Sequence, residues 1–198
     1  MTPRPYLSWS SLDLLERSEQ GWIDHYVFGK PVPINRGMAY GKAMADGLEN
    51  GEATGDPLLD VVIARIPKFE FMDKEFRTEI KDGKKIIPIL IKPDTTKEDL
   101  TAFKEFKTSQ KPWTKKMVDD SGQITFYATG LYLMSGKIPH DIELINVLTE
   151  ADEAGRLSAT GDILRFPTVR TTAQIINMIV RMKKAWVRIG QIMEEQLV

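Results

Sequence analysis

The chain has 198 residues, of which 42% are hydrophobic and 28% charged, a balance typical of a folded globular protein rather than a disordered one. It contains no cysteine, which excludes disulfide bonds, thiolate metal sites and iron–sulfur clusters. The formal net charge of -1 excludes nucleic-acid binding through a bulk positive field, so such binding would need local basic patches. We find no leader-like segment and no apolar run of membrane-spanning length, and therefore expect a cytoplasmic protein.

The first third of the chain is predicted to be helical. Serines suited to capping a helix open the segment 6–29, and its apolar residues recur at roughly helical spacing. A second helix is predicted from about Arg36 to Glu49, where a glycine-rich turn ends it. A short apolar helix follows within 56–69.

From Glu70 the pattern changes to that of strands. The segment 69–94 is predicted to form two strands joined at Asp82-Gly83, a dipeptide favoured in tight hairpins. The elements expected next are a strand at 102–109, an amphipathic helix within 119–136, a strand at 142–150, a strand or loop at 161–171, and a long helix from Thr171 or Thr172. This order favours one domain of the α/β or α+β class.

Charged groups are expected to meet beside the strand at 102–109. Asp94 is predicted to end the second hairpin strand, and Glu105 and Lys107 point to one face of the next strand. Neighbouring carboxylates repel unless a cation lies between them, and hard oxygen ligands suit Mg²⁺ or Mn²⁺. The backbone carbonyl of Phe106 can add a ligand, and Lys107 can orient a water or stabilise a transition-state charge. The alternative is an exposed Glu–Lys pair without a function.

Gln123 and Tyr127 complete the candidate catalytic set. They lie four residues apart, and therefore on one face of the helix predicted within 119–136. The alternative is that Gln123 is a surface polar residue and Tyr127 a core aromatic.

Taken in order, these residues resemble the core of the PD-(D/E)XK nuclease superfamily, where an acid ends one hairpin strand and Glu-x-Lys lies on the next. Here the corresponding stretches read "IKPD" and "FKEFKTSQKPW". The stretch "QITFY" resembles the Gln-x-x-x-Tyr motif of the RecB-like branch, which includes many phage exonucleases. "YLSWSSLDLLERSEQGWIDHYVFG" and "GMAYGKAMADGLE" are similar to the first two helices of that branch, and the likeness runs from about Tyr6 to Glu150.

The resemblance implies the fold and its divisions. We expect a single α/β domain over 1–198, with a restriction-endonuclease-like core in which helices flank a central mixed sheet. Its expected parts are the N-terminal helices at 1–68, the catalytic core at 69–150, and a C-terminal strand and helix at 151–198.

The resemblance also implies a Mg²⁺ site, in which Mn²⁺ can substitute. The expected ligands are Asp94, Glu105 and the Phe106 carbonyl, with Glu75 assisting from the preceding strand. Relatives often carry a histidine ligand in the second helix, where this chain has Ala45, so that Asp46 or Glu49 is a candidate replacement. Ser18 stands where the iron–sulfur members place a cysteine, which agrees with the absence of a cluster.

The implied function is metal-dependent hydrolysis of DNA phosphodiester bonds, by an exonuclease of DNA recombination, repair or phage DNA processing. Lys111, Trp113, Lys115 and Lys116 follow the Glu-x-Lys strand, where a DNA backbone would pass. The resemblance suggests a bacterial or phage-infected cytoplasm, with a recombination or single-strand annealing protein as partner and a homo-oligomer left open. RNA and structure-selective substrates also stay open. The alternative function is a catalytically inactive nucleic-acid-binding or assembly module of the same fold, and Ala45 is its best argument.

Overall fold

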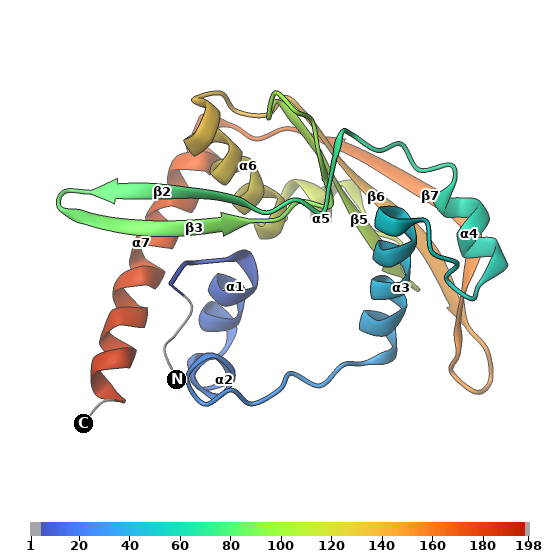
Figure 1. Ribbon diagram of the computed structural model, residues 1–198, viewed down its shortest axis with the longest axis horizontal. Helices are drawn as coiled ribbons and strands as arrows, with labels where there is room; N and C mark the ends of the chain where they lie inside the picture. The colour runs from blue at the N-terminus through green and yellow to red at the C-terminus, as the bar shows by residue number, and fades with distance from the viewer. Residues whose placement is uncertain (1–4, 197–198) are drawn as a thin grey trace.

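A five-stranded mixed sheet forms the centre of the molecule, with helices on both faces (Figure 1). The computed structural model describes residues 5–196. The strand order is β1-β4-β5-β6-β7, in which β5 and β6 are parallel and the other neighbours antiparallel. The strands are β1 (Phe71–Met72), β4 (Thr95–Thr96), β5 (Ala102–Ser109), β6 (Asp141–Ala151) and β7 (Leu157–Thr168). The predicted α/β class with a central mixed sheet is confirmed; residues 1–4 and 197–198 of the expected domain lie outside the described residues.

Side-chain caps set where most helices begin. The helical elements are α1 (Trp9–Arg17), α2 (Glu19–Trp22), the π-helical turn η1 (Ile23–Val27), α3 (Arg36–Asn50), α4 (Pro57–Ile63), α5 (Lys115–Asp119), α6 (Gly122–Ser135) and α7 (Thr172–Glu195). Asn35 caps α3 by accepting the N–H of Met38, and the left-handed Gly51 ends the helix. Helix α7 begins after Thr171, in agreement with the predicted start at Thr171 or Thr172, and Thr171 and Gln174 form a capping box there. Among residues 5–196, no helix has the length and apolar character needed to cross a membrane.

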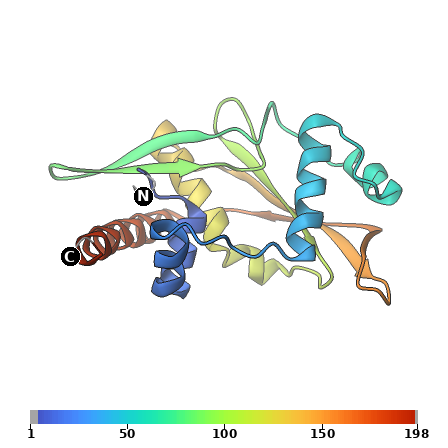
Figure 2. The same ribbon diagram turned by 60° about the horizontal axis from the view of Figure 1, so that its bottom comes forward.

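The two faces of the sheet bury separate apolar cores. Phe103, Ile142 and Leu144 point to one face, where they pack with residues of α1, α6 and α7. Ile145 and Val147 point to the other face and pack with residues of α3 and α4. Figure 2 shows α3 beside the sheet, away from α6 and α7. The fold is therefore layered. Successive side chains of a strand point to opposite faces of the sheet, so neighbouring residues join different cores.

The predicted hairpin forms, but it belongs to a second sheet. Strands β2 (Phe76–Asp82) and β3 (Lys85–Ile91) pair antiparallel as predicted, but the two residues of the turn are Gly83 and Lys84, one position later than the predicted Asp82-Gly83. Together they make a two-stranded sheet of their own, drawn in green and extending to the left in Figure 1. The prediction of two strands over 69–94 was incomplete, because Phe71–Met72 is a separate short strand that pairs with β4 in the central sheet.

Helix α6 is buried on nearly every side, so the prediction of an amphipathic helix was wrong. All eight residues from Ile124 to Leu131 are buried. The physical reason is that α6 contacts the hairpin strands and α7 as well as the core beneath the central sheet. Gly130 permits the close approach, because a Cβ there would lie 2.5 Å from Cγ2 of Ile91. The helix that carries Gln123 and Tyr127 is thus held rigidly.

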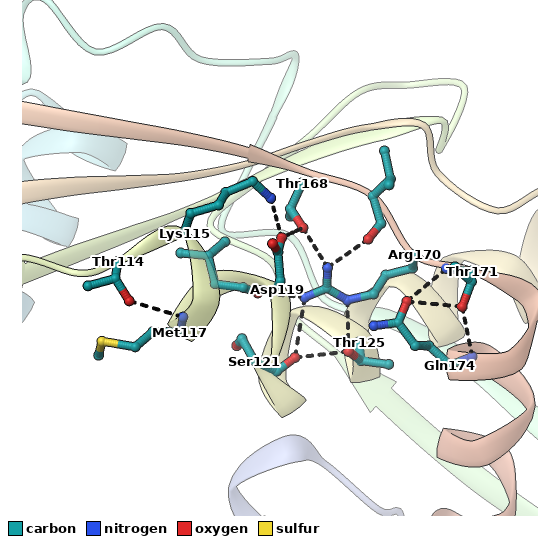
Figure 3. Close-up of polar contacts among 12 residues, drawn as sticks. Thr114, Lys115, Met117, Asp119, Ser121, Thr125, Thr168, Arg170, Thr171 and Gln174 are labelled. Atoms are coloured by element: carbon teal, nitrogen blue, oxygen red, sulfur yellow. Dashed lines mark hydrogen bonds and ion pairs between the residues drawn. The ribbon is translucent and has the colours of Figure 1, made fainter.

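Arg170, directly after β7, fastens the start of α6 to the end of the sheet. Its side chain is 4% exposed. The guanidinium donates to Oγ1 of Thr125 at 2.8 Å, to Oγ1 of Thr168 at 2.7 Å and to the carbonyl of Val118 at 2.8 Å (Figure 3). Burial lowers the pKa of Arg170, but an arginine stays protonated near neutral pH. This single side chain therefore ties α5, α6 and β7 together.

Asp56 is expected to stabilise the fold in a pH-dependent way. It caps α4 and accepts hydrogen bonds from the Tyr40 hydroxyl at 2.6 Å and from the Ala159 N–H at 2.8 Å. Burial alone would raise its pKa, but these bonds outweigh burial and lower the pKa in the folded state. The stabilisation is therefore present above the unfolded pKa of about 4 and is lost as the pH falls through the lower folded pKa.

The Asp56→Asn variant tests this contribution. Asparagine keeps the helix cap but removes the charge, so we expect a loss of about 1 kcal/mol in the free energy of unfolding at neutral pH. Urea titrations of both proteins between about pH 3 and 7 should show the difference shrinking below about pH 4. A difference that stays constant with pH would contradict the role of the charge.

Candidate active site

Strand β5 places Glu105 and Lys107 on the face that packs against α6. Nζ of Lys107 lies 2.6 Å from Oε1 of Glu105, so the prediction that both point the same way is confirmed. Glu105 is 2% exposed, which contradicts the alternative of an exposed surface pair. Its second oxygen, Oε2, is buried and has no hydrogen-bond partner within residues 5–196. A buried carboxylate oxygen without a donor is costly, and it indicates a group suited to a further cation or proton donor.

Asp94 lies beside this pair, although it does not end a hairpin strand as predicted. Strand β3 ends at Ile91, and Asp94 occupies the connection that leads into β4. Its Oδ2 accepts the backbone N–H of Phe106 at 2.5 Å, which fixes the carboxyl group against β5. The pairing of β4 with β5 reaches only two residues of each strand, so this side-chain bond continues the contact. Asp94 thus lies beside the Glu105–Lys107 pair as predicted, but it lies in a connection rather than at the end of a strand.

The site holds two acidic side chains and one lysine, and their surroundings shift the pKa of each. Burial raises the pKa of Asp94 to about 8, with the charge of Glu105 adding to it and that of Lys107 opposing it. Burial likewise raises the pKa of Glu105, against the opposing charge of Lys107. Burial would lower the pKa of Lys107, but Glu105 and Asp94 together raise it above its ordinary value. One ammonium group thus faces the buried carboxyl group of Glu105 and the partly buried one of Asp94.

Gln123 and Tyr127 also reach this region, from α6. Nε2 of Gln123 donates to the Tyr127 hydroxyl at 3.1 Å, and the Tyr127 ring meets Phe103 edge to face. Burial, followed by the charge of Glu105, raises the pKa of Tyr127, so its hydroxyl keeps its proton. Both residues line a cleft of about 280 Å³ together with Glu75 and Lys92. The structure therefore brings these two side chains to the edge of the charged set.

Asp73 joins the site and was missed by the sequence analysis. It follows β1, and its N–H donates to the carbonyl of Asp94 at 2.9 Å. Asp73, Asp94 and Glu49 together line a small cavity of about 90 Å³ against α3, where Ala45 also lies. The available signal was the aspartate in "FMDKEF", but reading 69–94 as a simple hairpin placed it inside a strand.

The other candidate ligands differ in whether they line this cavity. Glu49 contributes to it from α3, whereas Asp46 forms an ion pair with Lys42 at 2.6 Å. Glu75 lines the neighbouring cleft with Gln123 and Tyr127, and its exposed side chain lies 3.4 Å from Arg77. Within residues 5–196, no three histidine, cysteine or acidic side chains are already arranged to hold a metal ion.

The donor set nevertheless fits a hard divalent cation. Two carboxylates and a backbone carbonyl are typical of Mg²⁺ sites, in which the ion keeps several waters. The unpartnered Oε2 of Glu105 is the feature of this structure that such an ion would satisfy.

The four residues beyond β5 that are candidates for binding nucleic acid differ in their contacts and exposure. Lys115 and Lys116 form ion pairs on α5 with Asp119 and Asp120. Trp113 packs against the core on the α6 face, and Lys111 is exposed.

Comparison with known proteins places the fold. No family model and no curated protein matches the chain. The solved structure of a candidate exonuclease from Eubacterium rectale superposes with a TM-score of 0.62 at 13% identity, covering 94% of this chain and 80% of that one. An alkaline exonuclease from Laribacter hongkongensis gives a TM-score of 0.46 at 13% identity, covering 97% and 91%. At the level of the fold, the chain is therefore nuclease-like.

Proposed function

We propose that this protein is a divalent-metal-dependent DNA nuclease that hydrolyses phosphodiester bonds. The observation that carries the proposal is the environment of the buried Glu105. Its Oε1 forms an ion pair with Lys107, and its Oε2 has no hydrogen-bond partner in the described part of the chain although Asp94 lies nearby. The fold shared with a candidate exonuclease supports the same reading. From the sequence resemblance we further propose an exonuclease of DNA recombination, repair or phage DNA processing in a bacterial or phage-infected cytoplasm.

Asp94, Glu105 and the Phe106 carbonyl would hold Mg²⁺ or Mn²⁺. Glu49 would replace the helix histidine that is absent at Ala45, because it lines the cavity shared with Asp94. Glu75 would assist only from the cleft that it lines with Gln123 and Tyr127, because it does not line the cavity of Asp94. The ion supplies Lewis-acid activation of a water and of a phosphate oxygen.

Lys107 acts in this proposal as a cation rather than as a base. Its raised pKa keeps the ammonium group protonated at neutral pH, so it stabilises the negative charge that develops on the phosphate in the transition state. The protonated hydroxyl of Tyr127 and the amide of Gln123 donate hydrogen bonds that position the substrate. These roles follow from the protonation states of the two groups, which the neighbouring carboxyl groups maintain for Lys107 and burial maintains for Tyr127.

A DNA strand would leave the site past Lys111, Trp113, Lys115 and Lys116. We propose that Lys115 and Lys116 exchange their partners Asp119 and Asp120 for phosphate groups, since exposed ion pairs are weak. A recombination or single-strand annealing partner and a homo-oligomeric assembly are proposed by resemblance alone.

A cleavage assay with the Lys107→Met variant tests the function. We expect the native protein to degrade end-labelled linear DNA with Mg²⁺ or Mn²⁺ and not with EDTA. Removing the ammonium group should lower the rate by about 10²- to 10³-fold, because the transition-state charge loses its fixed counter-charge. Circular DNA, single strands and RNA distinguish exonuclease, endonuclease and ribonuclease action.

Lys97→Met is the matched control, because Lys97 also pairs with an acid two residues away but at the surface. Its rate should equal that of the native protein. A folded, metal-supplied protein that cleaves no substrate would reject the nuclease and favour the catalytically inactive binding or assembly module.

A further inference from the structure

We propose that Asp73 is a further ligand of the metal site, held by Lys92 until a divalent cation competes for its carboxylate. This inference rests on the proposed function and adds to it a residue that the sequence resemblance does not assign.

The position of Asp73 is fixed by the sheet. Met72 pairs with Thr95, so the next residue along β1 lies beside the residue preceding β4, which is Asp94. The hydrogen bond from the Asp73 N–H to the Asp94 carbonyl secures this neighbourhood. Both residues line the same small cavity, with Glu49 on its α3 side. Three acidic residues from three different elements therefore border one space.

The backbone of Asp73 is unusual. Its φ of +47° lies in the left-handed region, which costs a non-glycine residue about 1 kcal/mol. Glycine would adopt this conformation without strain, so the conformation alone does not call for an aspartate. The side chain of Asp73 also lines the cavity, beside Asp94.

The charge of Asp73 acts on the residues proposed to bind metal. Burial is the main cause of the raised pKa of Asp94 and of Glu105, and the negative charge of Asp73 raises both further. Independently, Glu105, on which the charge of Asp73 acts, leaves Oε2 buried without a partner among residues 5–196, and such an oxygen is suited to a cation.

Lys92 holds the carboxylate of Asp73 in this structure. Its Nζ lies 2.5 Å from Oδ2 of Asp73, and both side chains are partly exposed. Lys92 lines the cleft of Gln123 and Tyr127, whereas Asp73 lines the acidic cavity, so their ion pair connects the two spaces. A partly exposed ion pair is weak enough for a divalent cation to compete with it. Lys92 would then be free to face the cleft, where a phosphate would lie.

Calorimetric titration with Mn²⁺ tests the inference without using activity. The variants are Asp73→Asn, Lys92→Gln and the double variant, with Asp94→Asn as the reference for loss of the site. Asparagine tolerates a left-handed backbone, and circular dichroism checks the fold. Asp73→Gly, which relieves the strained backbone, provides the same test if the asparagine variant does not fold. Glu79→Gln removes a distant exposed carboxylate that pairs with Lys81, and serves as the matched control.

We expect Asp73→Asn to weaken Mn²⁺ binding by about tenfold or more, and Glu79→Gln to leave it unchanged. Lys92→Gln should tighten binding a few-fold in the native background and have a smaller effect in the Asp73→Asn background. This non-additivity separates competition for Asp73 from a general charge effect, which would be equal in both.

Two results would overturn the inference. Native Mn²⁺ affinity in Asp73→Asn, with binding lost in Asp94→Asn, would reject Asp73 as a ligand and leave the proposed function standing. A native protein that binds no Mn²⁺ would reject the metal-dependent function together with the inference.

Discussion

The Asp94→Asn variant is expected to lose metal-dependent cleavage by about 10³-fold or more, and yet to unfold at a higher temperature than the native protein when EDTA is present. The loss follows because asparagine removes one of the two carboxylates proposed to hold the ion. The gain follows because the same substitution removes a charge that the fold disfavours. This combination of opposite effects is what distinguishes a metal-binding acid from a structural one.

The sign of the stability change comes from the pKa of Asp94. A carboxyl group whose pKa is raised to about 8 is disfavoured in its charged form by the folded state. The unfolded state ionises near pH 4, so the free energy of unfolding falls as the pH rises between these two values. Asparagine cannot ionise and keeps an oxygen that can accept the Phe106 N–H. We therefore expect the melting temperature in EDTA at pH 7 to rise by about 3 °C or more.

Thermal unfolding with and without Mn²⁺ gives the complementary readout. Ligand binding stabilises only the protein that binds it, so the native melting temperature should rise with Mn²⁺ and that of Asp94→Asn should not. The Glu79→Gln control should follow the native protein in both conditions. A variant that melts lower in EDTA and still responds to Mn²⁺ would show that Asp94 is a structural acid.

Local patterns in the sequence predicted most of the fold. The alternation of residues in 102–109 placed Glu105 and Lys107 on one face, and the structure confirms it. The Asp82-Gly83 dipeptide placed the hairpin turn to within one residue, because the left-handed backbone at Gly83 favours glycine. Threonine at 171 placed the start of α7 through a cap that needs only neighbouring residues. These signals act over a few residues and can therefore be read directly.

The features that were missed depend on distant contacts. Strand β1 has two residues and owes its existence to pairing with β4, so the position of Asp73 beside Asp94 could not be inferred from its neighbours. The burial of α6 on nearly all sides arises from the hairpin, α7 and the sheet together. By contrast, the pairing of Lys115 with Asp119 follows the i,i+4 rule and was readable from the sequence.

The Arg170→Met variant is expected to cause the largest loss of stability, about 3 to 5 kcal/mol in the free energy of unfolding. Methionine fills part of the volume but donates no hydrogen bonds. The carbonyls of Val118 and Ser121 would lose their guanidinium donor, as would the hydroxyl oxygens of Thr125 and Thr168. Each buried acceptor left without a donor costs about 1 to 3 kcal/mol, and hydroxyl rotation recovers part of that.

Urea unfolding of Arg170→Met and Arg156→Met measures this difference. Arg156 pairs with Asp152, but its side chain is 82% exposed, so its loss should change the free energy of unfolding by about 0.5 kcal/mol or less. Equal stabilities of the two variants would show that water replaces the buried guanidinium without cost. Arg170→Lys should recover only part of the loss, because one ammonium cannot reach groups that the planar guanidinium spans.

The same contacts connect stability to the proposed chemistry. Arg170 bonds Thr125 and the carbonyl of Ser121, the residue that caps α6, and Gln123 lies between them. Loosening this end of α6 would displace Gln123 and, one turn later, Tyr127 relative to the carboxylates on β5. We therefore expect Arg170→Met to lose cleavage activity at temperatures well below its midpoint of unfolding, while Mn²⁺ binding to Asp94 and Glu105 persists. Loss of Mn²⁺ binding in the folded variant would instead show that Arg170 supports the whole site rather than α6 alone.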